Sequence, residues 1–169
     1  MTKTFILGGA RSGKSTRALE LAETVARDLV FIATAEALDD EMAARIASHQ
    51  AERNENWETI DAPLDLAAAI EGRARADCVV VVDCLTLWLS NLMHHGRDVE
   101  SEIAALAAAL KAAKGDLILV SNEVGLGLVP ETPLGRDFRD LQGRLNQHVA
   151  AACDVVEFVA AGLPIRLKG

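Results

Sequence analysis

The chain has 169 residues, half of them hydrophobic, and contains no apolar run near the roughly 18 residues that a membrane helix requires. The formal net charge of -8 and the absence of tyrosine argue against nucleic-acid binding, which needs basic and base-stacking surfaces. These limits predict one globular domain over residues 1–169, and the short start before the first apolar run favours a cytoplasmic protein without a signal peptide.

The first expected elements are a strand over 4–7 and a helix whose apolar face recurs every three to four residues. Between them lies a glycine-rich segment that reads Gly8, Gly9, Ala10, Arg11, Ser12, Gly13, Lys14 and Ser15. This order, G-x-x-x-x-G-K-S between a strand and a helix, is typical of phosphate-binding loops. It therefore favours nucleotide binding over a purely structural turn.

Each conspicuous residue type in this loop has a physical reason to be there. Gly8 and Gly13 allow backbone angles that turn the loop amides toward phosphate oxygens at the positive end of the following helix. Lys14 is expected to reach the β- and γ-phosphates, and the Ser15 hydroxyl is a candidate ligand for Mg²⁺.

Further along the chain, apolar runs alternate with helical patterns. The expected elements are a strand over 29–33, a helix over 39–53, a short strand or loop at 59–60, a helix after Pro63, a strand over 79–82, a helix over 99–113, a strand over 117–120, a helix over 136–152, and strands over 155–159 and 164–167. Continuous apolar strands separated by helices predict an α/β fold with a mostly parallel sheet covered on both faces. Gly162-Leu163 predicts a tight turn, so the last two strands are expected to be antiparallel.

Two carboxylates are expected at the carboxyl ends of buried strands, where ligands gather in such folds. Asp83 ends the run Val79–Val82, either as a Mg²⁺ ligand or as the N-cap of a following helix, and the nearby phosphate loop favours the metal. Glu123 follows the strand over 117–120 and is a candidate general base, metal-shell ligand or loop-fixing group.

His49 lies on the helix expected over 39–53, with Arg45 and Arg53 one turn away on either side. A histidine at the margin of an apolar face is most often structural, but two arginines beside it offer charge neutralisation for a phosphate chain. The cysteines at 78, 84 and 153 have no metal-ligand spacing and are expected to be reduced thiols.

Several of these segments together resemble a known family. The matching stretches are the loop 8–15, Asp39-Asp40-Glu41-Met42, Arg45-Ile46 with His49 and Arg53, Trp57, Asp83-Cys84-Leu85-Thr86, Asn122-Glu123-Val124-Gly125, and the late segments 136–140 and 143–147. In this order they are similar to the bifunctional adenosylcobinamide kinase/adenosylcobinamide-phosphate guanylyltransferases of cobalamin biosynthesis. The resemblance covers nearly the whole chain and implies a RecA-like P-loop fold.

The resemblance implies two reactions. In the first, ATP or GTP phosphorylates the primary hydroxyl of the aminopropanol arm of adenosylcobinamide. In the second, GTP forms a histidine-linked GMP with release of pyrophosphate, and adenosylcobinamide phosphate then attacks that GMP to give adenosylcobinamide-GDP. A histidine suits this role because unprotonated imidazole is a competent nucleophile near neutral pH.

The family's functional residues fall on defined positions of this chain. The guanylylated histidine corresponds to His49, with Lys14 as phosphate clamp and Ser15 with Asp83 as the Mg²⁺ site. Nucleotide contacts correspond to the loop 8–15 and to Ala33, Thr34, Ala35, Gln50, Ala51, Glu52, Arg53, Asp61 and Asp83. Asp61 stands where several relatives have Glu, and the family tends to form homotrimers. A single-function P-loop kinase of another small alcohol is the alternative; it would need the loop and Asp83 but not His49.

Overall fold

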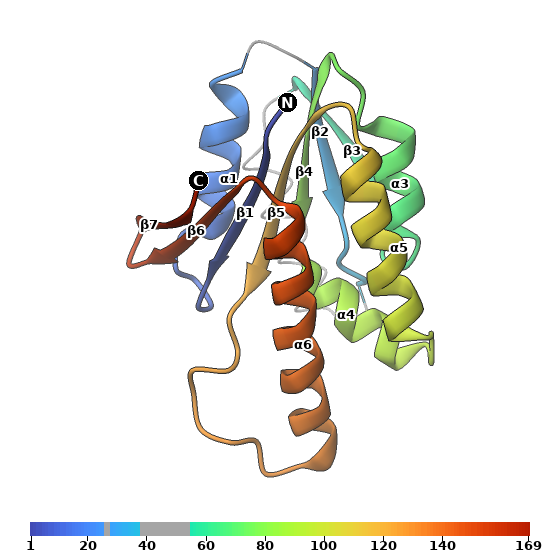
Figure 1. Cartoon of the computed structure of the whole chain (residues 1–169), viewed down its shortest axis with the longest axis vertical. Helices are drawn as coiled ribbons and strands as arrows, with labels where there is room; N and C mark the ends of the chain where they lie inside the picture. The colour runs from blue at the N-terminus through green and yellow to red at the C-terminus, as the bar shows by residue number, and fades with distance from the viewer. Residues whose placement is uncertain (26–27, 38–54) are drawn as a thin grey trace.

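The computed structural model describes residues 1–25, 28–37 and 55–169, and its seven described strands form one sheet (Figure 1). The strands are β1 Lys3–Gly8, β2 Asp28–Ala33, β3 Trp57–Asp61, β4 Cys78–Asp83, β5 Asp116–Asn122, β6 Val155–Ala160 and β7 Leu163–Lys168. Their order across the sheet is β3-β2-β4-β5-β1-β6-β7, and every neighbouring pair is parallel except β6 with β7. The predicted parallel sheet with an antiparallel end is therefore confirmed.

Helices cover both faces of this sheet, as the apolar strands predicted. In residues 1–25, 28–37 and 55–169 they are α1 Lys14–Glu23, α3 Leu66–Arg73, α4 Leu85–His94, α5 Val99–Ala112 and α6 Pro133–Ala152. One apolar core lies between the sheet and α1, and a second lies between the opposite face and the other four helices. Figure 1 shows that the first half of α6 extends past the carboxyl ends of the strands. None of the helices in the described part of the chain has the length and apolar character needed to span a bilayer.

Most boundaries agree with the sequence patterns, and the differences have physical causes. The sequence left a short strand or a loop open at residues 59–60. These residues belong to β3, which pairs with β2, so the segment is a strand. The final turn is formed by Ala161 and Gly162, both with positive φ, one residue before the predicted position. The helix α4, which the sequence offered only as one that Asp83 could cap, follows β4; its N-cap is Cys84, and Asp83 is the last residue of β4. The helix expected over 39–53 lies outside the described residues.

The hairpin formed by β6 and β7 is tied to the start of α1 by a buried carboxylate. Glu157, only 3% exposed, accepts hydrogen bonds from Arg17 at 3.0 and 3.1 Å and from Arg166 at 3.2 Å. The hydrogen bonds from Arg17 hold the pKa of Glu157 below its usual value, although burial acts in the opposite direction. This cluster fixes α1, which begins at the phosphate loop, against the hairpin.

We expect Glu157→Gln to lower the free energy of unfolding at neutral pH by about 1.5–3 kcal/mol, because it removes a buried carboxylate that bonds two guanidinium groups. Since the folded-state pKa of Glu157 is lowered, its stabilisation is full above the usual value of 4.5 and disappears as pH falls through the folded-state pKa. The difference in stability between the two proteins should therefore shrink as pH falls below 4.5. Urea denaturation at neutral pH and over a series of acidic pH values measures this.

The control is Glu58→Gln, which breaks an exposed pair with Arg73 and should cost no more than about 1 kcal/mol. An equal loss for the two variants, or a loss for Glu157→Gln that does not shrink in acid, would contradict the assigned ion pair.

Candidate active site at the carboxyl edge of the sheet

The segment between β1 and α1 packs directly on the turn of the final hairpin. A Cβ atom on Gly8 would lie 2.3 Å from the carbonyl oxygen of Val159, and one on Gly13 would lie 3.2 Å from Cα of Gly162. Gly13 also has φ +100° and immediately precedes the first residue of α1. Close approach thus requires glycine at position 8, the positive φ favours it at position 13, and the loop ends at a helix N-terminus as the motif predicts.

Lys14 is buried within this loop, with 6% of its surface exposed. Its ammonium group donates hydrogen bonds to the carbonyl oxygen of Gly9 and, at 3.5 Å, to Oγ of Ser12. Burial lowers the pKa of Lys14, and the nearby Asp83 carboxylate partly opposes that shift. A bound phosphate would offer this desolvated ammonium an anionic partner instead of neutral oxygens.

The strand register brings several predicted residues to one edge of the sheet. Ala33 ends β2 opposite both Asp61 of β3 and Asp83 of β4, so these three residues form a row. On the other side of β4, β5 separates Asp83 from the phosphate loop, and its last residue, Asn122, pairs with Gly8. The loop and Asp83 thus flank the end of β5. Ser15 lies in the first turn of α1, at the same edge.

Thr34, a predicted nucleotide contact, is completely buried and holds the turn after β4. Its hydroxyl accepts a hydrogen bond from the Cys84 amide at 2.8 Å and donates to the Cys84 carbonyl oxygen at 2.7 Å. The Asn91 side chain donates to the Thr34 carbonyl oxygen at 2.7 Å. This bonding fixes the backbone that carries Asp83, while Ala35 follows Thr34 in a half-buried position.

The described cysteines are all free and buried, in agreement with the expected reduced thiols. Burial, followed by the Asp83 carboxylate, raises the pKa of Cys84 to about 12. The thiol next to the candidate metal ligand is therefore protonated at neutral pH, which favours a small packing residue over a nucleophile.

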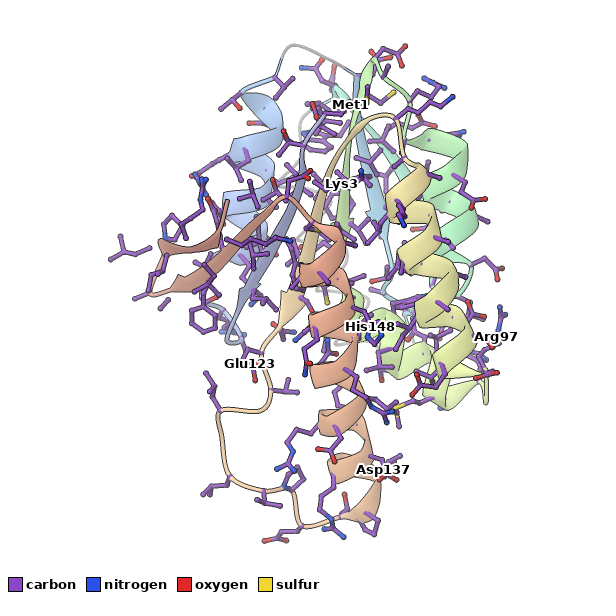
Figure 2. All side chains as sticks on the ribbon, in the orientation of Figure 1. Met1, Lys3, Arg97, Glu123, Asp137 and His148 are labelled. Carbon is purple, nitrogen blue, oxygen red and sulfur yellow. The ribbon has the colours of Figure 1, made fainter. Side chains whose placement is uncertain are left out.

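Glu123 directly follows β5 and is joined to the phosphate loop through its backbone. Its amide donates to the carbonyl oxygen of Gly8 at 3.0 Å, and its carboxylate accepts a hydrogen bond from the amide of Gly125. Figure 2 shows Glu123 at the end of β5, where the long connection to α6 begins. Of the three roles left open by the sequence, the structure shows a loop-fixing contact and also a place beside the phosphate loop.

Five residues of the predicted site lie outside the described part of the chain: His49, Gln50, Ala51, Glu52 and Arg53. The other three histidines, His94, His95 and His148, are exposed.

A group of polar side chains inside the core beneath this edge was not predicted from the sequence. Gln142 is completely buried and Asn146 is 6% exposed, although both lie on α6 beside its apolar stripe. Their i, i+4 spacing next to buried Leu145 was the available signal, since it places both on the inward side of the helix.

Comparison with known proteins adds to this geometry. A family model described as cobinamide kinase / cobinamide phosphate guanyltransferase matches residues 4–167. The bifunctional adenosylcobalamin biosynthesis protein CobP of Pseudomonas aeruginosa is 47% identical over 169 residues, covering 99% of this chain and 98% of that protein. The corresponding protein CobU of Escherichia coli is 38% identical over 179 residues, covering 97% and 98%.

Solved structures resemble the fold at low sequence identity. The solved structure of an ATPase domain has a TM-score of 0.52 and 14% identity, covering 93% of this chain and 68% of that chain. The structure of PH0250 from Pyrococcus horikoshii OT3 has a TM-score of 0.58 and 7% identity, covering 99% and 86%. At such identities the likeness concerns the fold alone, and it confirms the predicted RecA-like P-loop architecture.

Proposed function

The chain belongs to the cobinamide kinase / cobinamide phosphate guanyltransferase family, and on that premise we propose that it catalyses both reactions in turn. It phosphorylates adenosylcobinamide with ATP or GTP and then transfers GMP from GTP to the product, giving adenosylcobinamide-GDP and pyrophosphate. The observation that carries this function is the family match over residues 4–167. The gathering of a complete phosphate loop and Asp83 at one edge of the sheet supports it.

In the kinase step, the acceptor hydroxyl oxygen bonds to the γ-phosphorus while the bond to the bridging oxygen breaks. The leaving nucleoside diphosphate gains negative charge, which Lys14 and the loop amides would stabilise. This step needs positioning and charge neutralisation more than covalent chemistry from the protein.

In the guanylyltransferase step, we propose His49 as the nucleophile. An imidazole nitrogen bonds to the α-phosphorus of GTP, and the bond to the β-phosphate oxygen breaks to release pyrophosphate. A phosphate oxygen of adenosylcobinamide phosphate then attacks the same phosphorus, and the nitrogen–phosphorus bond breaks. The nucleotide contacts assigned to 33–35, 50–53 and Asp61 belong to this proposal, as does Lys14 on the leaving pyrophosphate.

We assign Ser15 and Asp83 as the residues that would hold Mg²⁺. A hydroxyl and a carboxylate are the hard oxygen donors that this ion prefers, and both lie at the edge of the sheet beside the phosphate loop. When bound, Mg²⁺ would neutralise charge on the nucleotide phosphates.

We further propose a homotrimer, as the family resemblance implies, acting in the cytoplasm, where ATP and GTP are supplied. Support for self-association comes from large apolar side chains that are exposed in the connection to α6, in the first turn of α6 and on β7: Leu126, Leu128, Val129, Leu134, Leu163, Ile165 and Leu167. Exposed apolar groups in such number are typical of an interaction surface.

Nucleotide turnover with and without adenosylcobinamide tests the function. We expect ATP or GTP consumption to require the corrinoid acceptor and Mg²⁺, and GTP to be needed for the final product. Chelation of divalent ions should abolish both reactions, since the phosphate charge then lacks its counter-ion. Turnover that depends on another alcohol, and no pyrophosphate release from GTP, would instead identify the single-function kinase.

A further inference from the structure

A cluster of four polar side chains, three buried and one half-buried, lies beneath the end of β5, and the two proposed reactions leave it without a role. Its members are Thr86 of α4, Ser121 of β5, and Gln142 and Asn146 of α6; we call them the polar cluster. Ser121 and Gln142 are completely buried, and Asn146 is 6% exposed.

The members of the polar cluster hydrogen-bond to one another. The Gln142 side chain donates at 2.9 Å both to Oγ of Ser121 and to Oδ1 of Asn146, and Ser121 Oγ donates to Asn146 at 2.8 Å. Oγ1 of Thr86 lies 3.4 Å from Oγ of Ser121. Within the described part of the chain, Oε1 of Gln142 has no hydrogen-bond partner.

Two hydrogen bonds join the polar cluster to the backbone of Asn122, one to its amide and one to its carbonyl oxygen. The Asn122 amide donates to Oγ1 of Thr86 at 2.8 Å, and the Asn146 side chain donates to the Asn122 carbonyl oxygen at 3.2 Å. The next amide, that of Glu123, bonds to Gly8 in the phosphate loop. Side chains of α4 and α6 therefore hydrogen-bond to the backbone just before Glu123, and the phosphate loop hydrogen-bonds to the backbone of Glu123 itself.

Filling this part of the core with polar side chains costs free energy of folding. Burying amide and hydroxyl groups costs free energy unless they are bonded, and apolar side chains of similar volume would pack here without an unpaired oxygen. Hydrogen bonds are directional, so the polar groups fix the position of the end of β5 relative to α4 and α6.

Glu123 lies where the orientation of its carboxylate would affect a reaction at the phosphate loop. It follows the strand that lies between β1, which leads into the phosphate loop, and β4, which ends at Asp83. A carboxylate at this position is suited to accept a proton from an acceptor hydroxyl that attacks a phosphate held in the loop.

We propose that Glu123 accepts the proton of the attacking hydroxyl in the kinase step and that the polar cluster positions it. The hydroxyl oxygen bonds to the γ-phosphorus, the nucleoside diphosphate leaves, and the proton passes to the Glu123 carboxylate. Glu123 is then a catalytic residue, and Thr86, Ser121, Gln142 and Asn146 are positioning residues. The inference rests on the proposed kinase activity.

The test compares two reactions of the same protein, kinase turnover with adenosylcobinamide and acceptor-independent labelling by GTP carrying a radioactive α-phosphate. We expect Glu123→Gln and Asn146→Leu each to lower the kinase kcat by about 10- to 100-fold, with much smaller effects on the nucleotide KM and on labelling. The double variant should be little worse than Glu123→Gln alone, because both changes act through one carboxylate.

Val149→Ala is the control, since Val149 is buried one turn along α6 but does not belong to the polar cluster. It should lower the thermal midpoint while changing kinase turnover and labelling in equal proportion. Thr86 provides a second route that does not depend on the folding of Asn146→Leu, because Thr86 is only half-buried. Thr86→Val should lose kinase turnover, and Thr86→Ser, which keeps the hydroxyl, should recover most of it.

A normal kinase kcat in Glu123→Gln would overturn the inference, as would additive losses in the double variant. Equal losses of kinase turnover and labelling in the cluster variants would also overturn it, since that pattern indicates a general folding defect. A wild-type protein without kinase turnover would instead refute the proposed kinase function itself.

Discussion

We expect His49→Ala to abolish the covalent labelling of the protein by GTP that carries a radioactive α-phosphate. Without the imidazole no nitrogen–phosphorus bond forms, so guanylyl transfer should fall by at least about 10³-fold. The wild-type label should be labile in acid and stable in alkali, as a histidine phosphoramidate is. Phosphorylation of adenosylcobinamide should persist in the variant, since that step uses the phosphate loop and needs no imidazole nucleophile.

His148→Ala is the matched control, because His148 is an exposed histidine on α6 (Figure 2). It should label as the wild type does. Label that survives in His49→Ala, or a folded wild-type protein that binds GTP and never labels, would remove His49 from its proposed role and revive the single-function kinase.

The second large effect is expected for Lys14→Ala, which should depress both reactions by about 10²- to 10³-fold. Lys14 is buried in the phosphate loop, so no solvent shell replaces its charge when phosphate oxygens become more negative in the transition state. Steady-state kinetics of the kinase step and labelling with GTP measure the two losses separately.

Lys111→Ala provides the comparison, since Lys111 is an exposed lysine in the last turn of α5. It should leave both rates near those of the wild type. The contrast between His49 and Lys14 is itself informative: one change should remove a single reaction, and the other should impair both. If Lys14→Ala spared the kinase step, the loop would not be its phosphate site.

The sequence predicted those parts of the fold whose signal is local. The run Val79–Val82 indicates a buried strand by composition alone, and Leu66 with Ile70 marks the inward face of α3, where both are fully buried. The loop 8–15 was recognisable because its function demands particular residues at fixed spacing. Parallel pairing then brought Asp83 and Asp61 to one edge without further information.

The beginnings of two helices differ from the prediction because the residues there carry no strong sequence signal for a helix N-terminus. The helix α4 begins after Cys84, which makes no side-chain capping hydrogen bond, and Asp83, the capping residue that the sequence offered, belongs to β4 instead. The helix α6 begins at Pro133, capped by Thr132, several residues before the apolar stripe used to predict it. Its first turns extend beyond the sheet, so no core-facing periodicity marks them (Figure 1).

Other features depend on partners far away in the sequence. Glu157 interrupts an apolar strand, and nothing near it in the sequence identifies Arg17 as its partner. The same holds for Ser121, whose bonds to Gln142 and Asn146 exist only after α6 has packed on the sheet. Buried polar contacts of this kind are products of tertiary structure, and a pattern of apolar spacing carries no record of them.

The contacts between the phosphate loop and the β6–β7 hairpin have a consequence for synthesis. A ribosome makes the loop among the first residues, yet Val159, Gly162 and Arg166, which shape or anchor it, emerge much later. A nascent chain that carries the whole motif but lacks this hairpin has no contacts from Val159 and Gly162 to support the loop. On the proposed function, ATP and GTP would therefore stabilise only a chain whose late strands are already paired, and nucleotide binding would follow folding during translation.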